Sequence, residues 1–174
     1  GRTGAKWVQE LADKYDIPYM SQSIEVGVRV EVRKDIMEEI TNVIYDPTIF
    51  IKTDTYGDEI RTFCTNPGGF VTVESYENNG KKLFTANGHA FAEKKSDNTN
   101  FAILVTRNFN EDCPNPLEDY VFTITQAMNS LGKGSVILQS LKDIKLNRRS
   151  TEERIKELDI VPTANVYKGD ITSV

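Results

Sequence analysis

The chain has 174 residues, of which 39% are hydrophobic and 27% are charged, with a formal net charge of −5 and a pI near 5.0. This size and composition predict one soluble domain with a substantial core. The acidic balance argues against a protein that binds nucleic-acid backbones, because that role needs clustered Lys and Arg. No apolar run is long enough to span a bilayer, and the N-terminus lacks the order of a signal peptide. We therefore expect a cytoplasmic protein without a membrane anchor.

Cysteine and histidine usage limits the chemistry further. Cys64 and Cys113 are the two cysteines, and two cysteines in a domain of this size give no disulfide framework. We expect both to be free thiols. His89 is the single histidine, and neither a Cys-x-x-Cys nor a His-x-x-x-His spacing occurs, so no metal site is expected.

The N-terminal third predicts a helix, a strand and a second helix. The first helix is indicated by apolar residues on one face between residues 6 and 15. Residues 24–33 then alternate Ile or Val with charged residues and one glycine, which predicts a strand with one dry face and one charged face. The second helix is expected to be capped by Asp35 with Glu38 at the reciprocal position, and to stop at Asp46-Pro47. Its predicted apolar side consists of Ile36, Ile40, Val43 and Ile44.

Strands dominate the middle of the chain, and helices return after it. From residue 49 to residue 107 short connections predict antiparallel hairpins, with Phe101 to Val105 as a central strand. The expected turns are Gly57-Asp58, Asn66-Pro67-Gly68-Gly69, Asn78-Asn79-Gly80, Asn87-Gly88 and residues 96–100. Pro116 opens a long helix, about 116–131, with Gly132 as its C-cap. Ser150 and Glu153 predict a capping box for a short helix. The predicted fold is α+β: a mostly antiparallel β-sheet packed by one long helix and flanked by short helices.

Cys64 is the first candidate for chemistry. Arg61 lies nearby in sequence and a turn with free backbone N–H groups follows, and both features favour a thiolate. The alternative is a buried and inert thiol in a strand, which is common for free cysteine. Cys113 lies between Asp112 and Pro114, where acidic company disfavours a thiolate.

His89 is the second candidate. It follows Asn87-Gly88, a dipeptide typical of tight turns, and could act as an acid, a base or a hydrogen-bond donor. A couple with Cys64 would require the two side chains to meet, and no Asp or Asn is designated to orient the ring. The alternative is a structural histidine that caps a turn.

Two further segments have a functional and a structural interpretation. The glycines of Asn66-Pro67-Gly68-Gly69 permit close approach to a flat or anionic ligand, but they equally suit a plain hairpin turn. Arg148-Arg149-Ser150 could meet a phosphate at the N-terminus of the following helix, or simply face water.

Several segments together resemble the bacterial FAD-dependent dehydrogenases, often called NAD(FAD)-utilising dehydrogenases. The resemblance spans nearly the whole chain, and its most specific part is the Arg-Thr-Phe-Cys and Pro-Gly-Gly block. The segments occur in a similar order in that family: Gly1-Arg2-Thr3-Gly4-Ala5-Lys6-Trp7, Gly27-Val28-Arg29-Val30-Glu31, Tyr45-Asp46-Pro47, residues 61–69, Asn87-Gly88-His89, Asn98-Thr99-Asn100-Phe101-Ala102, Arg148-Arg149-Ser150-Thr151 and Gly169-Asp170.

This resemblance implies a fragment of a larger enzyme. Family members are two-domain flavoproteins in which an inserted domain interrupts a Rossmann-like FAD domain, and the chain has no G-x-G-x-x-G fingerprint. The resemblance therefore implies that residues 1–174 are the inserted, substrate-side domain of an oxidoreductase, inactive alone, with 1–18 and 160–174 as connections to the FAD domain. Its partners would be that domain of the same chain, FAD bound mainly by it, NAD(P)H as a candidate co-substrate, and a small-molecule substrate.

In that interpretation, one group of residues would form the flavin-facing or substrate-facing wall, with Cys64 and His89 as the catalytic candidates. The other wall residues would be Arg61, Asn66, Gly68, Gly69 and Asn87. Two other classes remain open from the residues alone. One is a non-catalytic module that binds a small molecule or a protein, and the other is a self-contained Cys-His enzyme.

Overall fold

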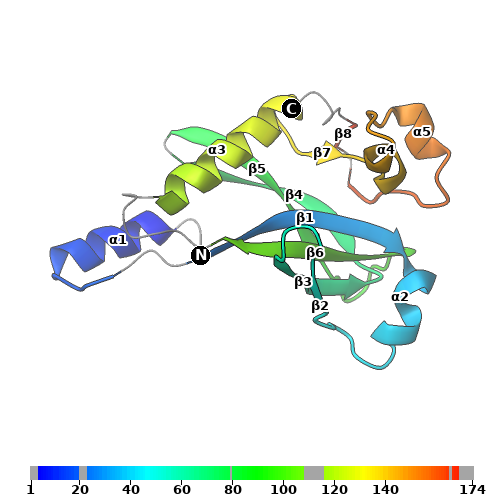
Figure 1. Ribbon diagram of the computed structural model, residues 1–174, viewed down its shortest axis with the longest axis horizontal. Coiled ribbons are helices and arrows are strands. Elements are labelled where there is room, and N and C mark those ends of the chain that lie inside the picture. The colour runs from blue at the N-terminus through cyan, green and yellow to red at the C-terminus, as the bar shows by residue number, and fades with distance from the viewer. Residues whose placement is uncertain (1–3, 20–22, 79, 108–115, 165, 169–174) are drawn as a thin grey trace.

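The computed structural model describes residues 4–19, 23–78, 80–107, 116–164 and 166–168. It confirms an α+β fold with mostly antiparallel strands (Figure 1). The helices are α1 (Ala5–Lys14), α2 (Lys34–Thr41), α3 (Pro116–Leu131), α4 (Leu141–Lys145) and α5 (Glu152–Lys156). The strands are β1 (Ile24–Arg33), β2 (Phe50–Lys52), β3 (Glu59–Pro67), β4 (Phe70–Asn78), β5 (Lys81–His89), β6 (Asn98–Arg107), β7 (Ile137–Leu138) and β8 (Tyr167–Lys168).

The main sheet has four strands in the order β1-β6-β3-β2, and every neighbouring pair is antiparallel. The expected central strand is confirmed, since β6 lies between β1 and β3. Its register with β1 runs without interruption from Ile24 opposite Arg107 to Arg33 opposite Asn98. The register with β3 shifts between Phe63 and Asn66, where β3 carries a bulge.

β4 and β5 form a separate two-stranded hairpin that lies across the main sheet rather than within it. The prediction of consecutive hairpins was therefore wrong for β3 and β4, which do not pair. The long helix was expected to pack on the sheet, but α3 lies beside the hairpin, above the main sheet in Figure 1. The amide of Asn129 fixes it there, accepting from Phe84 N at 2.7 Å and donating to Phe84 O at 2.9 Å.

The two faces of β1 are not used as the alternation predicted. The charged face is the one that the hairpin and the C-terminal segment cover, since Arg29 and Glu31 enter hydrogen-bond networks there. On the valine face, Val28 keeps 62% of its surface exposed. Strand periodicity separates two faces but does not say which one is packed, and here hydrogen bonds satisfy the polar one.

The helices α1 and α2 leave apolar residues in solvent. Trp7, Val8 and Tyr15 of the α1 region are exposed, although they share the predicted apolar face. On α2 the buried residue is Thr41. The predicted apolar side is exposed at all four positions, namely Ile36, Ile40, Val43 and Ile44. The last two lie beyond α2, because the helix ends at Thr41 and not at Asp46-Pro47 as predicted. This part of the prediction was wrong in its packing, although the helix itself is present.

Two predicted helix caps are replaced by other contacts. Helix α2 begins at Lys34 without a side-chain cap, and Asp35 pairs with Arg33 instead. Helix α5 is capped by Thr151, whose hydroxyl accepts from Arg154 N. Ser150, the predicted cap, is fully buried and donates to Asp143 at 2.7 Å. Each residue bonds another side chain instead of the helix backbone, Asp35 at the surface and Ser150 in the interior.

Asp143 is the centre of a small polar cluster that holds the α4–α5 region together. It is almost completely buried, accepts from Ser150 and from Arg148 Nε at 2.6 Å, and its own N–H bonds the Ser140 hydroxyl. These hydrogen bonds, the Ser150 bond foremost, lower the pKa of Asp143 to about 2. Arg148 is therefore engaged in an internal ion pair.

Candidate functional site

The bulge in β3 places Cys64 in an uncommon backbone conformation. Its φ is +52°, in the left-handed region that residues other than glycine seldom adopt. The shift of register between Phe63 and Asn66 marks the same point in the ladder with β6. Backbone strain of this kind persists only where the surroundings enforce it, and it often marks functional sites.

Both sides of the peptide bond that follows Cys64 are held. The Cys64 carbonyl accepts from Arg29 Nη1 at 2.9 Å and from Asn66 Nδ2 at 2.8 Å. On the other side, Thr65 N donates to the Asp46 carboxylate at 2.7 Å. Charge-assisted hydrogen bonds are stronger than neutral ones, and two of these three involve a charged group. The strained bulge is therefore a built feature of the fold.

Arg29 is the most connected of the site residues that sequence reasoning missed. It projects from β1 towards the hairpin, and its guanidinium reaches Cys64 O, Asn100 Oδ1 at 3.4 Å and Asn87 Oδ1 at 3.5 Å. The signal was an arginine within a valine-rich strand, which alternation alone assigns to a solvated face. We call Arg29, Asn66, Asn87 and Asn100 the polar hub. It joins β1, β3, β5 and β6.

The segment Asn66-Pro67-Gly68-Gly69 forms a tight turn, as predicted, but it connects the main sheet to the hairpin. Gly69 N donates to Asn66 O at 3.1 Å, and Gly68 has a φ of +65°, which favours glycine at that position. A Cβ on Gly69 would lie 2.6 Å from Asn66 Cβ and 2.8 Å from His89 O. The glycines therefore serve close packing against β5.

Asn87 and Gly88 lie within β5, so the predicted turn at this dipeptide was wrong. The glycine is required for another reason. A Cβ on Gly88 would lie 2.3 Å from Asn100 Oδ1, 2.7 Å from Arg29 Nη1 and 2.7 Å from Asn66 Nδ2. The backbone of β5 thus passes directly over the polar hub, where only glycine leaves room.

His89 ends β5 and faces outward beside Glu74. Its Nε2 lies 2.9 Å from Glu74 Oε1, and the same oxygen accepts from Asn87 Nδ2 at 3.0 Å. The imidazole stacks on Phe91 at a centroid distance of 6.1 Å, and Phe91 contacts Phe70 edge-on at 5.6 Å. His89 is 42% exposed at its side chain. Together, His89, Phe91 and Phe70 form an aromatic shelf next to the polar hub.

Arg61 lies apart from this network. Its guanidinium makes a two-pronged ion pair with Glu25, at 2.6 Å and 2.5 Å, and stacks over Phe63 at 4.8 Å. The bond to Glu25 raises the pKa of Arg61, and the same bond lowers the pKa of Glu25. The charge of Arg61 is neutralised by this carboxylate. The prediction that Arg61 favours a thiolate at Cys64 was therefore wrong. Arg29 is the cation next to Cys64, and it bonds the carbonyl rather than the thiol.

The structure does not join Cys64 and His89. The Cys64 thiol is free and its sulfur accepts from Asn66 Nδ2 at 3.6 Å, while His89 Nε2 is taken by Glu74. Among the hydrogen bonds of the described residues, none links the thiol to the imidazole. The self-contained Cys-His couple therefore lacks the geometry it requires. Cys113 lies outside the described residues.

The polar hub is mostly interior. Asn66 is 7% exposed and Asn100 is fully buried, so neither presents a surface to a ligand. Two donors of the hub, Arg29 Nε and Asn100 Nδ2, have no partner among the described atoms. Buried donors without partners are costly, which shows how strongly the rest of the network enforces this arrangement. The residues able to touch a ligand are those of the aromatic shelf, with Cys64 partly accessible.

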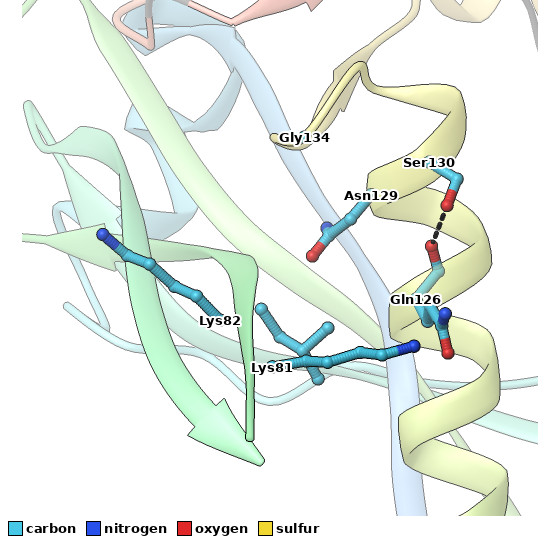
Figure 2. A pocket seen from close by; sticks show the side chains of 7 residues that line it. Lys81, Lys82, Gln126, Asn129, Ser130 and Gly134 are labelled. Carbon is cyan, nitrogen blue, oxygen red and sulfur yellow. Dashed lines mark hydrogen bonds between the residues drawn. The ribbon is translucent and has the colours of Figure 1, made fainter. Parts of the chain in front are cut away.

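Two pockets lie outside this network. One, of about 240 Å³, lies between the start of β5 and α3, where Lys81 points towards Gln126 while Lys82 points away from the helix (Figure 2). A larger groove of about 880 Å³ begins next to the shelf at Phe70, and its lining mixes cations and anions. The charged residues of this groove are Arg33, Lys34, Lys94, Asp35, Glu38, Asp97 and Asp159.

Comparison of the chain with protein-family models, curated proteins and solved structures finds no match. Within the described ranges, no three His, Cys, Asp or Glu side chains gather as they would around a metal ion. None of the described helices has the length and apolar character needed to cross a membrane.

Proposed function

We propose that this chain is the substrate-side, flavin-covering domain of a cytoplasmic FAD-dependent oxidoreductase. The observation that carries the proposal is one hydrogen-bond network in which Arg29 bonds Cys64 and Asn87, Asn66 bonds Cys64, and Glu74 links Asn87 to His89, with Gly69 packed against Asn66. These residues come from the blocks on which the family resemblance rests. A strained bulge, a glycine turn and an aromatic shelf that share one network suit a preorganised wall of a site.

The exposed apolar residues of α1 and α2 favour the presence of a partner domain. A helix with an apolar stripe normally buries that stripe, yet Trp7 of α1 is 62% exposed and Ile36 of α2 is 59% exposed. Large apolar surfaces of this kind mark sites of interaction. We infer that an FAD domain of the same protein covers part of this surface, with 1–18 and 160–174 as the connections to it.

The described residues fit a covering role better than a role in holding FAD. Flavin dinucleotides are usually held by a glycine-rich turn at a helix N-terminus, and the chain has no such fingerprint. What the chain offers instead is aromatic and polar: His89 and Phe91 on the shelf, with Glu74 fixing the imidazole. FAD would supply the hydride chemistry, and these side chains would orient the substrate and exclude water.

The test uses the whole protein that contains this chain. We expect His89→Ala and Phe91→Ala to slow reduction of the bound flavin, or to change its visible spectrum, without releasing the flavin. Val161→Ala is the matched control, because Val161 is 82% exposed and does not belong to the shelf. A flavin whose reduction and spectrum are the same in both shelf variants and in the control would refute the proposed wall.

A second candidate is a non-catalytic interaction or small-molecule-binding module. The exposed apolar residues of α1 and α2 favour it equally, because they require a partner but not a flavin. A tight complex of the isolated chain with a ligand or protein, in the absence of any flavin domain, would support this second function over the first.

A further inference from the structure

The edge strands of the sheets differ in length and in the contacts on their outer side. Edge strands present free N–H and C=O groups, and proteins usually shorten, charge or cover them. β2 is only three residues long, and it ends on Lys52. On the hairpin, the Asn129 amide occupies both backbone groups of Phe84, while Thr163 Oγ1 accepts from Val71 N at 2.8 Å. The edge strand β2 is therefore short, and each hairpin strand carries a contact at one residue of its edge.

β1 has no such contact on its outer edge among the described residues. It is ten residues long, contains no proline, and keeps an unbroken register with β6 on its inner side. Glu25, Gly27 and Val28, in its N-terminal half, are exposed. A long edge of β-branched residues without protection is a template for another strand.

The sequence of β1 is complementary to itself in one antiparallel register. When Gly27 of one copy lies opposite Gly27 of another, Glu25 and Arg29 lie at opposite positions on one face of the joined sheet, where each keeps its own partner within the chain, Arg61 for Glu25 and Cys64 O for Arg29. On the other face, Val26 lies opposite Val28 and Ile24 opposite Val30. Cross-strand pairs of β-branched residues stabilise a sheet, and this register brings no like charges opposite each other.

The two registers shifted towards the C-terminal end of the strand are disfavoured by charge. Centring the pair on Val28 places Glu25 opposite Glu31, and centring it on Arg29 places that arginine opposite its own copy. Like charges directly opposite each other destabilise a strand pair. The register centred on Gly27 also coincides with the exposed stretch of the strand.

We propose that two copies of this chain associate through β1, forming one continuous eight-stranded antiparallel sheet centred on Gly27. The strand order β1-β6-β3-β2 is then mirrored across the twofold axis. The pairing uses only this chain, so it stands or falls independently of the flavin-covering function.

Analytical ultracentrifugation of the full chain tests the proposal. We expect a concentration-dependent dimer that Val28→Lys weakens at least about tenfold, since lysine on an edge blocks pairing. Val161→Lys, at another exposed valine, is the control and should dimerise like the wild type. A chain that stays monomeric up to about 1 mM, or a dimer equally sensitive or insensitive to both variants, would overturn it.

A mixing experiment tests the register. Val26→Asp and Val28→Lys should each weaken the dimer alone, and an equimolar mixture should recover it, because Asp and Lys then lie opposite each other once per heterodimer. Circular dichroism of each variant checks that it is folded. Failure of the mixture to recover association, with both variants folded, would refute this register.

Discussion

Gly88→Ala tests whether the polar hub is as tightly packed as the contacts indicate. The new methyl carbon would lie 2.3 Å from Asn100 Oδ1 and 2.7 Å from both Arg29 Nη1 and Asn66 Nδ2. Overpacking a close-packed site costs about 1–3 kcal/mol. Moving Asn100 Oδ1 aside also breaks its bonds from Arg29 and Asn66, which costs about 1–3 kcal/mol for donors left buried.

We therefore expect Gly88→Ala to lower the free energy of unfolding by about 3 kcal/mol, and the melting temperature by about 6–12 °C. The assay is urea unfolding followed by circular dichroism. Gly4→Ala is the matched control, because its Cβ meets nothing within 4 Å and its effect should stay within about 0.5 kcal/mol. If Gly88→Ala proves as stable as Gly4→Ala, the hub is looser than described and the account of Gly88 is wrong.

Three other outcomes follow from the same contacts. The φ of Cys64 is +52°, so Cys64→Val should be less stable than Cys64→Gly by about 1–2 kcal/mol in urea unfolding. Equal stabilities of the two variants would contradict an enforced left-handed backbone. Because the pKa of Asp143 is lowered, this carboxylate stabilises the fold fully above its ordinary pKa of 3.8, and the stabilisation is lost as the pH falls through about 2. Acid unfolding of Asp143→Asn should lack this pH dependence, and an acid-unfolding profile equal to that of the wild type would count against the Asp143 cluster. In a Cys113→Ser background, His89→Ala should not change the rate at which an electrophile labels Cys64 at neutral pH, because Glu74 holds the imidazole. Slower labelling in His89→Ala would instead support the Cys-His couple.

Features with local causes could be predicted from the sequence. Strict alternation set the bounds of β1, and Pro67-Gly68 specified a turn whose second central residue has a positive φ. The apolar run from Phe101 to Val105 correctly indicated the central strand. Each of these signals is carried by residues a few positions apart, so no tertiary contact is needed to interpret it.

Features with distant causes could not be predicted. Gly88 resembled a turn residue because Asn-Gly usually is one, but the atoms that require a glycine belong to residues 29, 66 and 100. Arg29 resembles a solvated strand residue in the sequence, because the hairpin that covers it is distant along the chain. The gathering of Cys64, Asn87 and His89 on one network likewise depends on how the hairpin crosses the sheet, which no local pattern encodes.

The most direct test of the central claim is the flavin content of the protein translated from the complete reading frame that includes residues 1–174. The purified protein is denatured, and the released flavin is quantified by absorbance and chromatography. The proposed flavin-covering role predicts stoichiometric FAD in that protein and none in the isolated chain. A colourless complete protein, or FAD held tightly by the isolated chain, would contradict it.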